Sequence, residues 1–231
     1  MQQRNVAGFT AILFTVLSVG AMLPAAVSAQ VTASLGVANM YLWRGQNLTP
    51  DGGQVHGGVR YDNGPFYAGM WTTSEQGGHE TDLYLGIRGT AGEFGYDLSW
   101  VEYLYPENGT APNDGLSDTD TSELILSASY SLFTATAYIN TDSDTGDDNY
   151  FTIAADIDRW NLTFGFWDLE NPGSGTAGAD EYSHITVKYA LTDALTTGVS
   201  VAMSDLDVGA ANGVEEDPLF LIAYDWSFDV K

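Results

Sequence analysis

The segment from Glu123 to Ile139, ELILSASYSLFTATAYI, contains two runs in which every second residue is apolar. The apolar positions of the first run extend from Leu124 to Tyr130, and those of the second from Phe133 to Ile139. A period of two is typical of β-strands with one polar and one apolar face. Only Ser131 and Leu132 separate the runs. The segment therefore predicts two antiparallel strands joined by a tight turn.

The same alternation recurs along most of the chain. The further runs cover residues 31–37, 55–61, 83–88, 96–100, 151–157, 160–166, 185–191, 195–203 and 220–228, and residues 66–71 form an aromatic-rich strand with weaker alternation. Membrane strands take about 9–11 residues each, so the chain has room for about twelve. Neither a helical period nor a linker follows residue 29. We therefore predict an all-β, antiparallel up-and-down transmembrane β-barrel of about 12 strands, with residues 30–231 as one domain.

The first residues have the layout of a secretory signal peptide. A short basic start ends at Arg4, an uncharged and mostly apolar run extends from Val6 to Leu23, and small residues follow Pro24. We expect residues 1–29 to be removed after export through the inner membrane. The alternative is an uncleaved membrane anchor, because the run is close to spanning length. After Gln30 the longest apolar run, Pro218 to Tyr224, is far short of the ~20 residues that a helix needs.

The connections between the predicted strands alternate in length. Tight turns are expected at residues 62–64, 91–93, 131–132, 158–159 and 192–193, and longer loops at 44–53, 74–79, 106–121, 141–148, 169–180 and 205–216. Most acidic residues fall in or beside the longer loops. Short turns at one end and long loops at the other are typical of outer-membrane barrels, in which charge is costly on the lipid-facing band.

Charge and cysteine content exclude several classes of function. The formal net charge is −24, and cysteine is absent. A chain this acidic repels nucleic acid, and thiol catalysis has no nucleophile. Acidic loops would concentrate cations at the mouth of a pore. The acids between Asp142 and Asp148 do not fit an EF-hand, because Gly146 takes the place of a ligand. We expect a solvated acidic loop there, and neither a metal nor a cofactor.

One stretch carries a family resemblance. Asn39-Met40-Tyr41-Leu42-Trp43-Arg44-Gly45 resembles the N-terminal signature of the TorF-type porins, which are bacterial outer-membrane proteins. Further pieces follow in that family's order: Phe66 to Trp71; then Glu80, Asp82, Tyr84, Gly86 and Gly89; and then Tyr103 to Pro106. The resemblance covers roughly residues 34–106. It implies an outer-membrane barrel and a channel, without an established substrate. The chain departs from the common barrel ending, because Asp229-Val230-Lys231 follows Phe228.

Charged and histidine side chains on the polar faces of the predicted strands are the candidate pore-lining residues. They are Arg60, Arg88, Lys188, Asp97, Glu123, Asp156, His56 and His184. Two interpretations remain open: a hydrated pore with a transverse field, or a salt-bridged plug through which nothing passes. Small residues on the same faces, such as Gly58, Gly86, Gly165 and Gly198, favour the pore.

The expected partners are the lipid bilayer with its outer-leaflet lipid, and small solutes or cations. Aromatic residues near strand ends are predicted to form interfacial girdles, with Tyr224, Trp226 and Phe228 at one rim and Tyr41 and Trp43 at the other. A Ser200–His184 catalytic pair in a hydrolase or acyltransferase is a further alternative that only geometry can test. The sequence thus predicts a porin in the bacterial outer membrane, with a non-conducting surface barrel as the main alternative.

Overall fold

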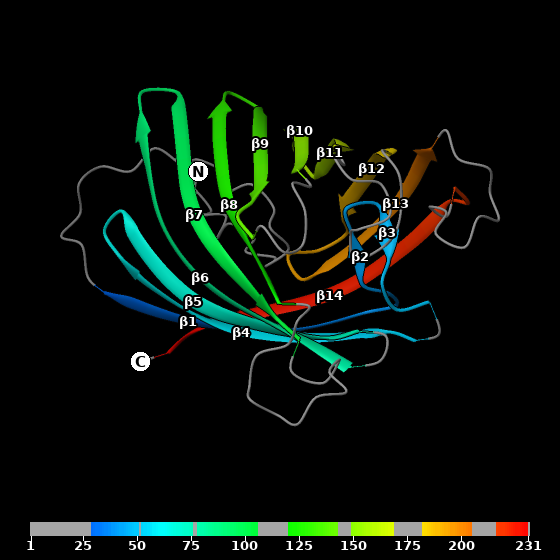
Figure 1. Cartoon of the computed structure of the whole chain (residues 1–231), viewed down its shortest axis with the longest axis horizontal. Coiled ribbons are helices and arrows are strands. Elements are labelled where there is room, and N and C mark those ends of the chain that lie inside the picture. Colours follow the sequence, from blue (N-terminus) through cyan, green and yellow to red (C-terminus); the bar gives the residue numbers. More distant parts are fainter. Residues whose placement is uncertain are drawn as a thin grey trace, which may run out of the picture.

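The computed structural model describes residues 29–50, 52–75, 78–105, 120–142, 149–168, 182–204 and 216–230. Twelve strands form one closed antiparallel barrel, and a separate short hairpin comprises β2 (Leu42–Trp43) and β3 (Gln46–Asn47) (Figure 1). The strands of the wall are β1 (Gln30–Ala38), β4 (Gln54–Asn63), β5 (Phe66–Glu75), β6 (Gly78–Ala91), β7 (Phe94–Leu104), β8 (Thr121–Tyr130), β9 (Phe133–Asn140), β10 (Asn149–Ile157), β11 (Trp160–Asp168), β12 (Tyr182–Ala190), β13 (Leu195–Ser204) and β14 (Leu219–Val230). The predicted all-β barrel is confirmed.

The last strand pairs with the first and closes the ring. β14 runs antiparallel to β1, with Leu35 opposite Trp226, and β1 also pairs with β4. Every other strand of the wall pairs with its neighbours in sequence, as an up-and-down barrel requires. Closure leaves no strand edge without a hydrogen-bonded partner, which is the condition for a sheet to cross lipid.

Tight turns lie at one end of the barrel, which we call the tight-turn end. At this end Ser131 and Asp158 adopt left-handed backbone conformations, with φ of 56° and 54°. At the opposite, long-loop end one prediction was wrong, because residues 74–79 do not form a long loop. β5 and β6 continue until Glu75 pairs with Gly78. The turn-forming residues there do not prevent β5 and β6 from pairing, because each of the two strands supplies hydrogen-bond partners for the backbone of the other.

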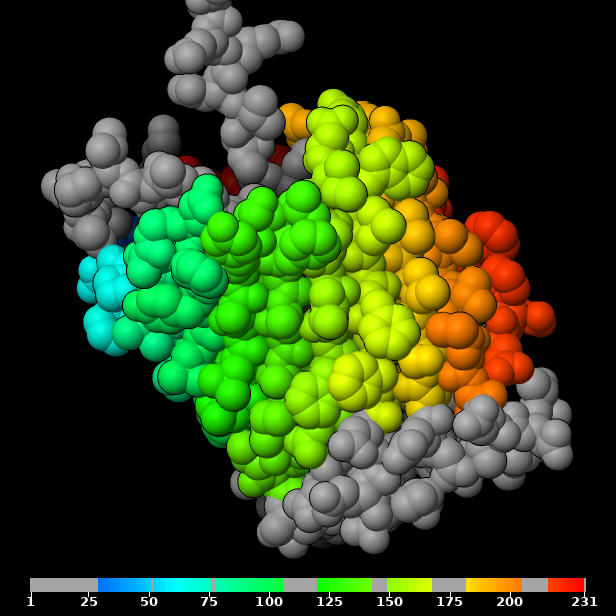
Figure 2. All heavy atoms as spheres, turned by 90° about the horizontal axis from the view of Figure 1, so that it is seen from above, coloured from blue at the N-terminus to red at the C-terminus, as the bar shows by residue number. Residues whose placement is uncertain are grey.

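The outer face of the wall is apolar. Leucine, isoleucine, valine and aromatic side chains that point outward are largely exposed, among them Leu85, Ile153 and Phe220. Figure 2 shows one side of this wall, where successive strands lie next to one another in sequence order from cyan to red. Trp226 and Phe228, predicted for a girdle, are exposed on this outer face. Within the described residues, no helix is long and apolar enough to span a membrane.

The outward direction of Ile153 gives a direct test of the lipid-facing wall. Ile153 lies in the middle of β10 and is 58% exposed, and Ile157 lies at the end of the same strand and is 51% exposed. We expect Ile153→Lys to lower the free energy of unfolding in lipid vesicles by about 2–4 kcal/mol and Ile157→Lys by about 0–1 kcal/mol. Denaturant titration of tryptophan fluorescence measures both. Equal effects of the two variants would contradict a depth-dependent apolar environment.

Candidate functional site

The segment that follows β1 folds into the barrel rather than along its rim. We call residues 39–49 the plug hairpin. Its two short strands pair Leu42 with Asn47, and the backbone of Leu48 donates to the carbonyl of Tyr41. At its tip Arg44 and Gly45 have φ of 47° and 86°. A Cβ on Gly45 would lie 2.6 Å from the ring of His184, so a side chain at this position would collide with the wall.

Arg44 is the central side chain of the plug hairpin. Its Nη2 lies 2.6 Å from Glu123 Oε2, and the two side chains are only 6% and 8% exposed. Four aromatic rings lie 4.5–4.9 Å from the guanidinium carbon, namely those of Trp43, Tyr138, Tyr150 and Trp167. Burial alone would lower the pKa of Arg44, but the Glu123 carboxylate more than offsets this and raises that pKa above its usual value. Arg44 is therefore a cation held by one carboxylate inside an aromatic cage.

Tyrosine hydroxyls attach the plug hairpin at further points. Tyr41 donates to Glu80 Oε1 at 2.8 Å, and Tyr105 donates to the other oxygen of Glu80 at 2.7 Å. From β12, Tyr182 donates to the carbonyl of Arg44 at 2.9 Å. Burial and the nearby Glu80 charge raise the pKa of Tyr41 well above its usual value. Tyr41 therefore remains a hydrogen-bond donor at neutral pH.

The other side of the plug hairpin is apolar. Met40 and Leu42 pack with Leu219 and Leu221, which point inward from β14. In the ring of twelve strands β14 stands six places from β8, the strand that carries Glu123. The plug hairpin thus contacts opposite sides of the wall. It spans the lumen near the long-loop end.

The predicted girdle role of Tyr41 and Trp43 is wrong. Tyr41 is buried among inward-facing side chains that include Trp71 and Tyr103, and Trp43 packs against Trp167. The physical reason is that the barrel interior offers carboxylates and aromatic faces for this segment, whereas the lipid offers no partner for Arg44.

All eight predicted pore-lining residues point to the interior, because each occupies the polar phase of its strand. They do not form one cluster. Glu123 belongs to the plug contact, while Arg60 and Arg88 share Asp62 at 3.0 and 2.6 Å near the tight-turn end. Tyr67 donates to Asp97 there at 2.5 Å. Opposite charges are therefore paired near that end, and the plug contact lies apart from them.

The remaining predicted residues have separate partners. His56 Nε2 lies 2.7 Å from Asp225, and Asp156 accepts from Asn161 at 2.8 Å near the tight-turn end. His184 is buried, and its ring nitrogens face Tyr150 at 2.6 Å and Thr186 at 3.0 Å.

Ser200 contacts Thr186 at 2.7 Å rather than His184. Among the described residues, the proposed Ser200–His184 pair is not formed.

Sequence reasoning missed several inward charges. Arg44, Glu80 and Asp82 occur in the sequence analysis only as parts of the family resemblance. Both acids are buried. The alternation of the sequence does indicate their direction, because Glu80 and Asp82 continue the inward-facing positions of Tyr84 and Gly86 toward the long-loop end.

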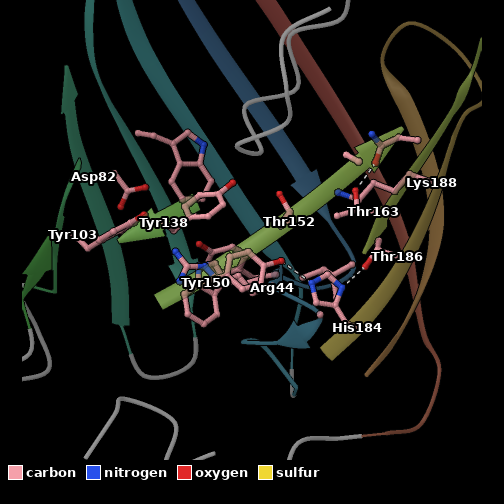
Figure 3. A pocket seen from close by; sticks show the side chains of 17 residues that line it. Arg44, Asp82, Tyr103, Tyr138, Tyr150, Thr152, Thr163, His184, Thr186 and Lys188 are labelled. Atoms are coloured by element: carbon pink, nitrogen blue, oxygen red, sulfur yellow. Dashed lines mark hydrogen bonds between the residues drawn. The ribbon is translucent and has the colours of Figure 1, made fainter. Parts of the chain in front are cut away.

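Below the plug hairpin, toward the tight-turn end, lies a cavity of about 130 Å³. In Figure 3, Arg44 and Tyr150 stand between Asp82 and Tyr103 on one side and His184 and Lys188 on the other. The inward glycines do not enlarge this space. A Cβ at Gly86 would meet the ring of Tyr67, and one at Gly165 would meet His184 and Tyr150. These glycines make room for rings, so they no longer favour an open pore.

Comparisons with known proteins agree with the barrel fold. The structure called "KdgM porin" shares 7% identity with this chain, at a TM-score of 0.49. The match covers 87% of this chain and 99% of that structure's chain. A structure described as "Unveiling the Mechanism Behind the in-meso Crystallization of Membrane Proteins" shares 7% identity, with 87% and 83% coverage and a TM-score of 0.53. The COG4313 outer membrane channel from Pseudomonas putida F1 shares 11%, with 90% and 97% coverage and a TM-score of 0.43. At such identities the likeness concerns the fold alone.

No curated protein matches the chain. A family model described as "Bacterial protein of unknown function (Gcw_chp)" matches residues 23–217. Because this match extends over most of the length of the chain, the chain belongs to the bacterial family Gcw_chp.

Proposed function

We propose that the protein is a narrow channel in the bacterial outer membrane, through which small solutes or ions diffuse passively. The plug hairpin constricts its lumen, and the acids inside and at the mouth give a weak preference for cations. Export by the signal peptide of residues 1–29 and the resemblance to TorF-type porins are parts of this proposal. The acidic loops at residues 106–119, 143–148, 169–181 and 205–215 lie outside the described residues.

The observation that carries the proposal is the way in which the plug hairpin is held. A wall with an apolar exterior and a polar interior encloses a segment whose contacts with β6, β8 and β12 are polar: Tyr41 with Glu80, Arg44 with Glu123, and Tyr182 with the carbonyl of Arg44. The other side of the segment packs on β14 through Met40 and Leu42. A segment needed only to fill a core would use such apolar packing on both sides, because a buried ion pair is weak support for stability. Polar contacts can exchange with water, so such a segment suits a constriction that moves.

Charge in the lumen supports the preference for cations. Among the described inward-facing residues, acids outnumber bases. The acids include Asp62, Glu75, Glu80, Asp82, Asp97, Glu123, Asp156, Asp225 and Asp229, and the bases are Arg44, Arg60, Arg88 and Lys188. An interior with excess negative charge attracts cations, and salt weakens that attraction.

Reconstitution of the mature protein into planar bilayers tests the proposal. We expect small, stepwise conductance, and in a KCl gradient a reversal potential displaced toward the potassium equilibrium potential. The displacement should shrink as the mean salt concentration rises, because screening shortens the reach of the lumen charges. A reversal potential on the chloride side would contradict the predicted preference.

The second candidate function is a non-conducting barrel that interacts with partners at the cell surface. It is favoured by the span of the plug hairpin from β14 to β8. This candidate expects the wild-type barrel to stay silent in bilayers, and it expects silence to persist when the plug hairpin is removed. Removal therefore separates the two functions.

A further inference from the structure

Three buried polar atoms, all on side chains of cavity-lining residues, have no hydrogen-bond partner within the described part of the chain. They are Nη1 of Arg44, the indole Nε1 of Trp71 and Oδ1 of Asp82. All three residues line the cavity of about 130 Å³. Trp71 is 5% exposed and Asp82 is 1% exposed. Leaving such groups unpaired costs stability, so their gathering around one cavity points to a ligand that pairs with them.

The chemistry of these atoms defines what the ligand must offer. The guanidinium and indole N–H groups donate, whereas the carboxylate of Asp82 accepts. A hydroxyl both donates and accepts, so a ligand with several hydroxyls can satisfy all three. The cavity is also lined by neutral side chains that both donate and accept hydrogen bonds, namely those of Thr152, Thr163, Thr186 and Asn161.

Charge around the cavity is balanced. Arg44 is neutralised by Glu123 at 2.6 Å. The two remaining charged residues of the lining have opposite sign, and Figure 3 shows Asp82 and Lys188 on opposite sides of the cavity. The Arg44 guanidinium already lies over the rings of Trp43, Tyr138 and Tyr150. A cationic ligand would therefore find its aromatic cage occupied, and an anion would face Asp82. A neutral ligand fits best.

Aromatic side chains supply the apolar part of the lining. Trp71, Tyr103 and Tyr150 are among the residues that line the cavity. Apolar walls with a few placed polar groups are typical of small-molecule sites. The C–H face of a short polyol matches such surfaces while its hydroxyls reach the polar atoms. A cavity of about 150 Å³ holds benzene, whose bulk is about six non-hydrogen atoms, so a polyol of about that many non-hydrogen atoms, such as glycerol, fits this cavity.

We infer that this cavity is a binding site for a neutral polyhydroxylated solute, namely a short polyol. The inference rests on the proposed function, because solutes reach the lumen through the channel. The site lies on the path directly below the constriction and selects among the solutes that diffuse through. The competing occupant is water, about four molecules at about 30 Å³ each.

Equilibrium binding to the detergent-solubilised barrel tests the site without requiring conduction. The probes are ethylene glycol, glycerol and erythritol, compared with glycine, glutamate and choline. We expect isothermal titration calorimetry to show saturable binding for the hydroxylated probes only. Trp71→Phe keeps a ring but loses the donor and should weaken binding about fivefold to tenfold, and Asp82→Asn should weaken it about tenfold or more. The matched controls are Trp100→Phe on the outer wall and Asp97→Asn on the inner wall, which lie outside this cavity.

Three results would overturn the inference. They are the absence of saturable binding by any hydroxylated probe, which means that the cavity holds water only; equal binding of the charged probes; and equal losses in the control variants. Binding together with silent bilayers would refute the channel and leave the site intact. Conductance without binding would refute the site and leave the channel intact.

Discussion

Joining Asn39 directly to Gly53 by deletion of residues 40–52 will raise the single-channel conductance several-fold while the barrel stays closed. Ala38 and Gln54 lie opposite each other in the register of β1 and β4. Two residues are enough to connect such a pair, and Asn-Gly is the preferred sequence for a two-residue hairpin turn. The deletion removes the plug hairpin from the lumen and breaks no strand pair of the wall. Planar-bilayer recordings of both proteins measure the effect.

The controls for this deletion concern the wall. Asn39 remains, and with it the side-chain bonds to the backbone of Phe220 and Ile222 at 2.7 Å. The circular dichroism spectrum of the deletion variant, and the change in its electrophoretic mobility on heating, should therefore match those of the wild type. A deletion variant that folds normally but stays silent would exclude the channel in favour of the non-conducting barrel. A variant with wild-type conductance would show that the plug hairpin is not the constriction.

Replacing Arg44 by alanine will also open the lumen, through a different cause. The change leaves the Glu123 carboxylate buried, with the hydroxyl of Tyr103 at 2.7 Å as its remaining partner. Breaking a buried ion pair from one side costs about 3–5 kcal/mol. Movement of the plug hairpin, which lets water reach Glu123, relieves this cost. We therefore expect longer open times in bilayers and a smaller loss of global barrel stability than the full amount.

A double variant and a control make this prediction specific. In Arg44→Leu with Glu123→Leu no charge is left unpaired, so the lumen should close again and conductance should fall below that of Arg44→Ala. Arg159→Ala removes an exposed arginine that donates to backbone carbonyls at the tight-turn end, and it should leave conductance unchanged. If the double variant conducts as well as the alanine variant, the ion pair is not what holds the constriction.

Much of the fold could be predicted because strand alternation is a local property. Each of the twelve wall strands overlaps a predicted run, and the tight turns fall near their expected positions. The exception is the connection around Ser74 and His79, which pair with each other. In the sequence, polar residues near a strand end have the same pattern whether they continue the strand or begin a loop. Pairing with the neighbouring strand determines which of the two occurs.

The site was predicted only in part. Alternation placed His56, Arg60 and the other predicted residues on the inner face, but it could not say which charges meet. Asp62 bridges Arg60 and Arg88 from two strands, and Asp225 joins His56 from far along the chain. Such pairs depend on the angular position of each strand in the ring, which no local pattern encodes.

The sequence by itself determines which side chains of each strand face out of the barrel, because every second side chain of a strand points the same way. Only the tertiary structure decides that residues 39–49 enter the lumen. Arg44 and Glu123 are 79 positions apart in the chain, and their contact exists because closing the ring places β8 opposite β14. The enclosed interior then offers the arginine a carboxylate and four aromatic rings, and this makes burial of a charge favourable where the rim would have left it in water.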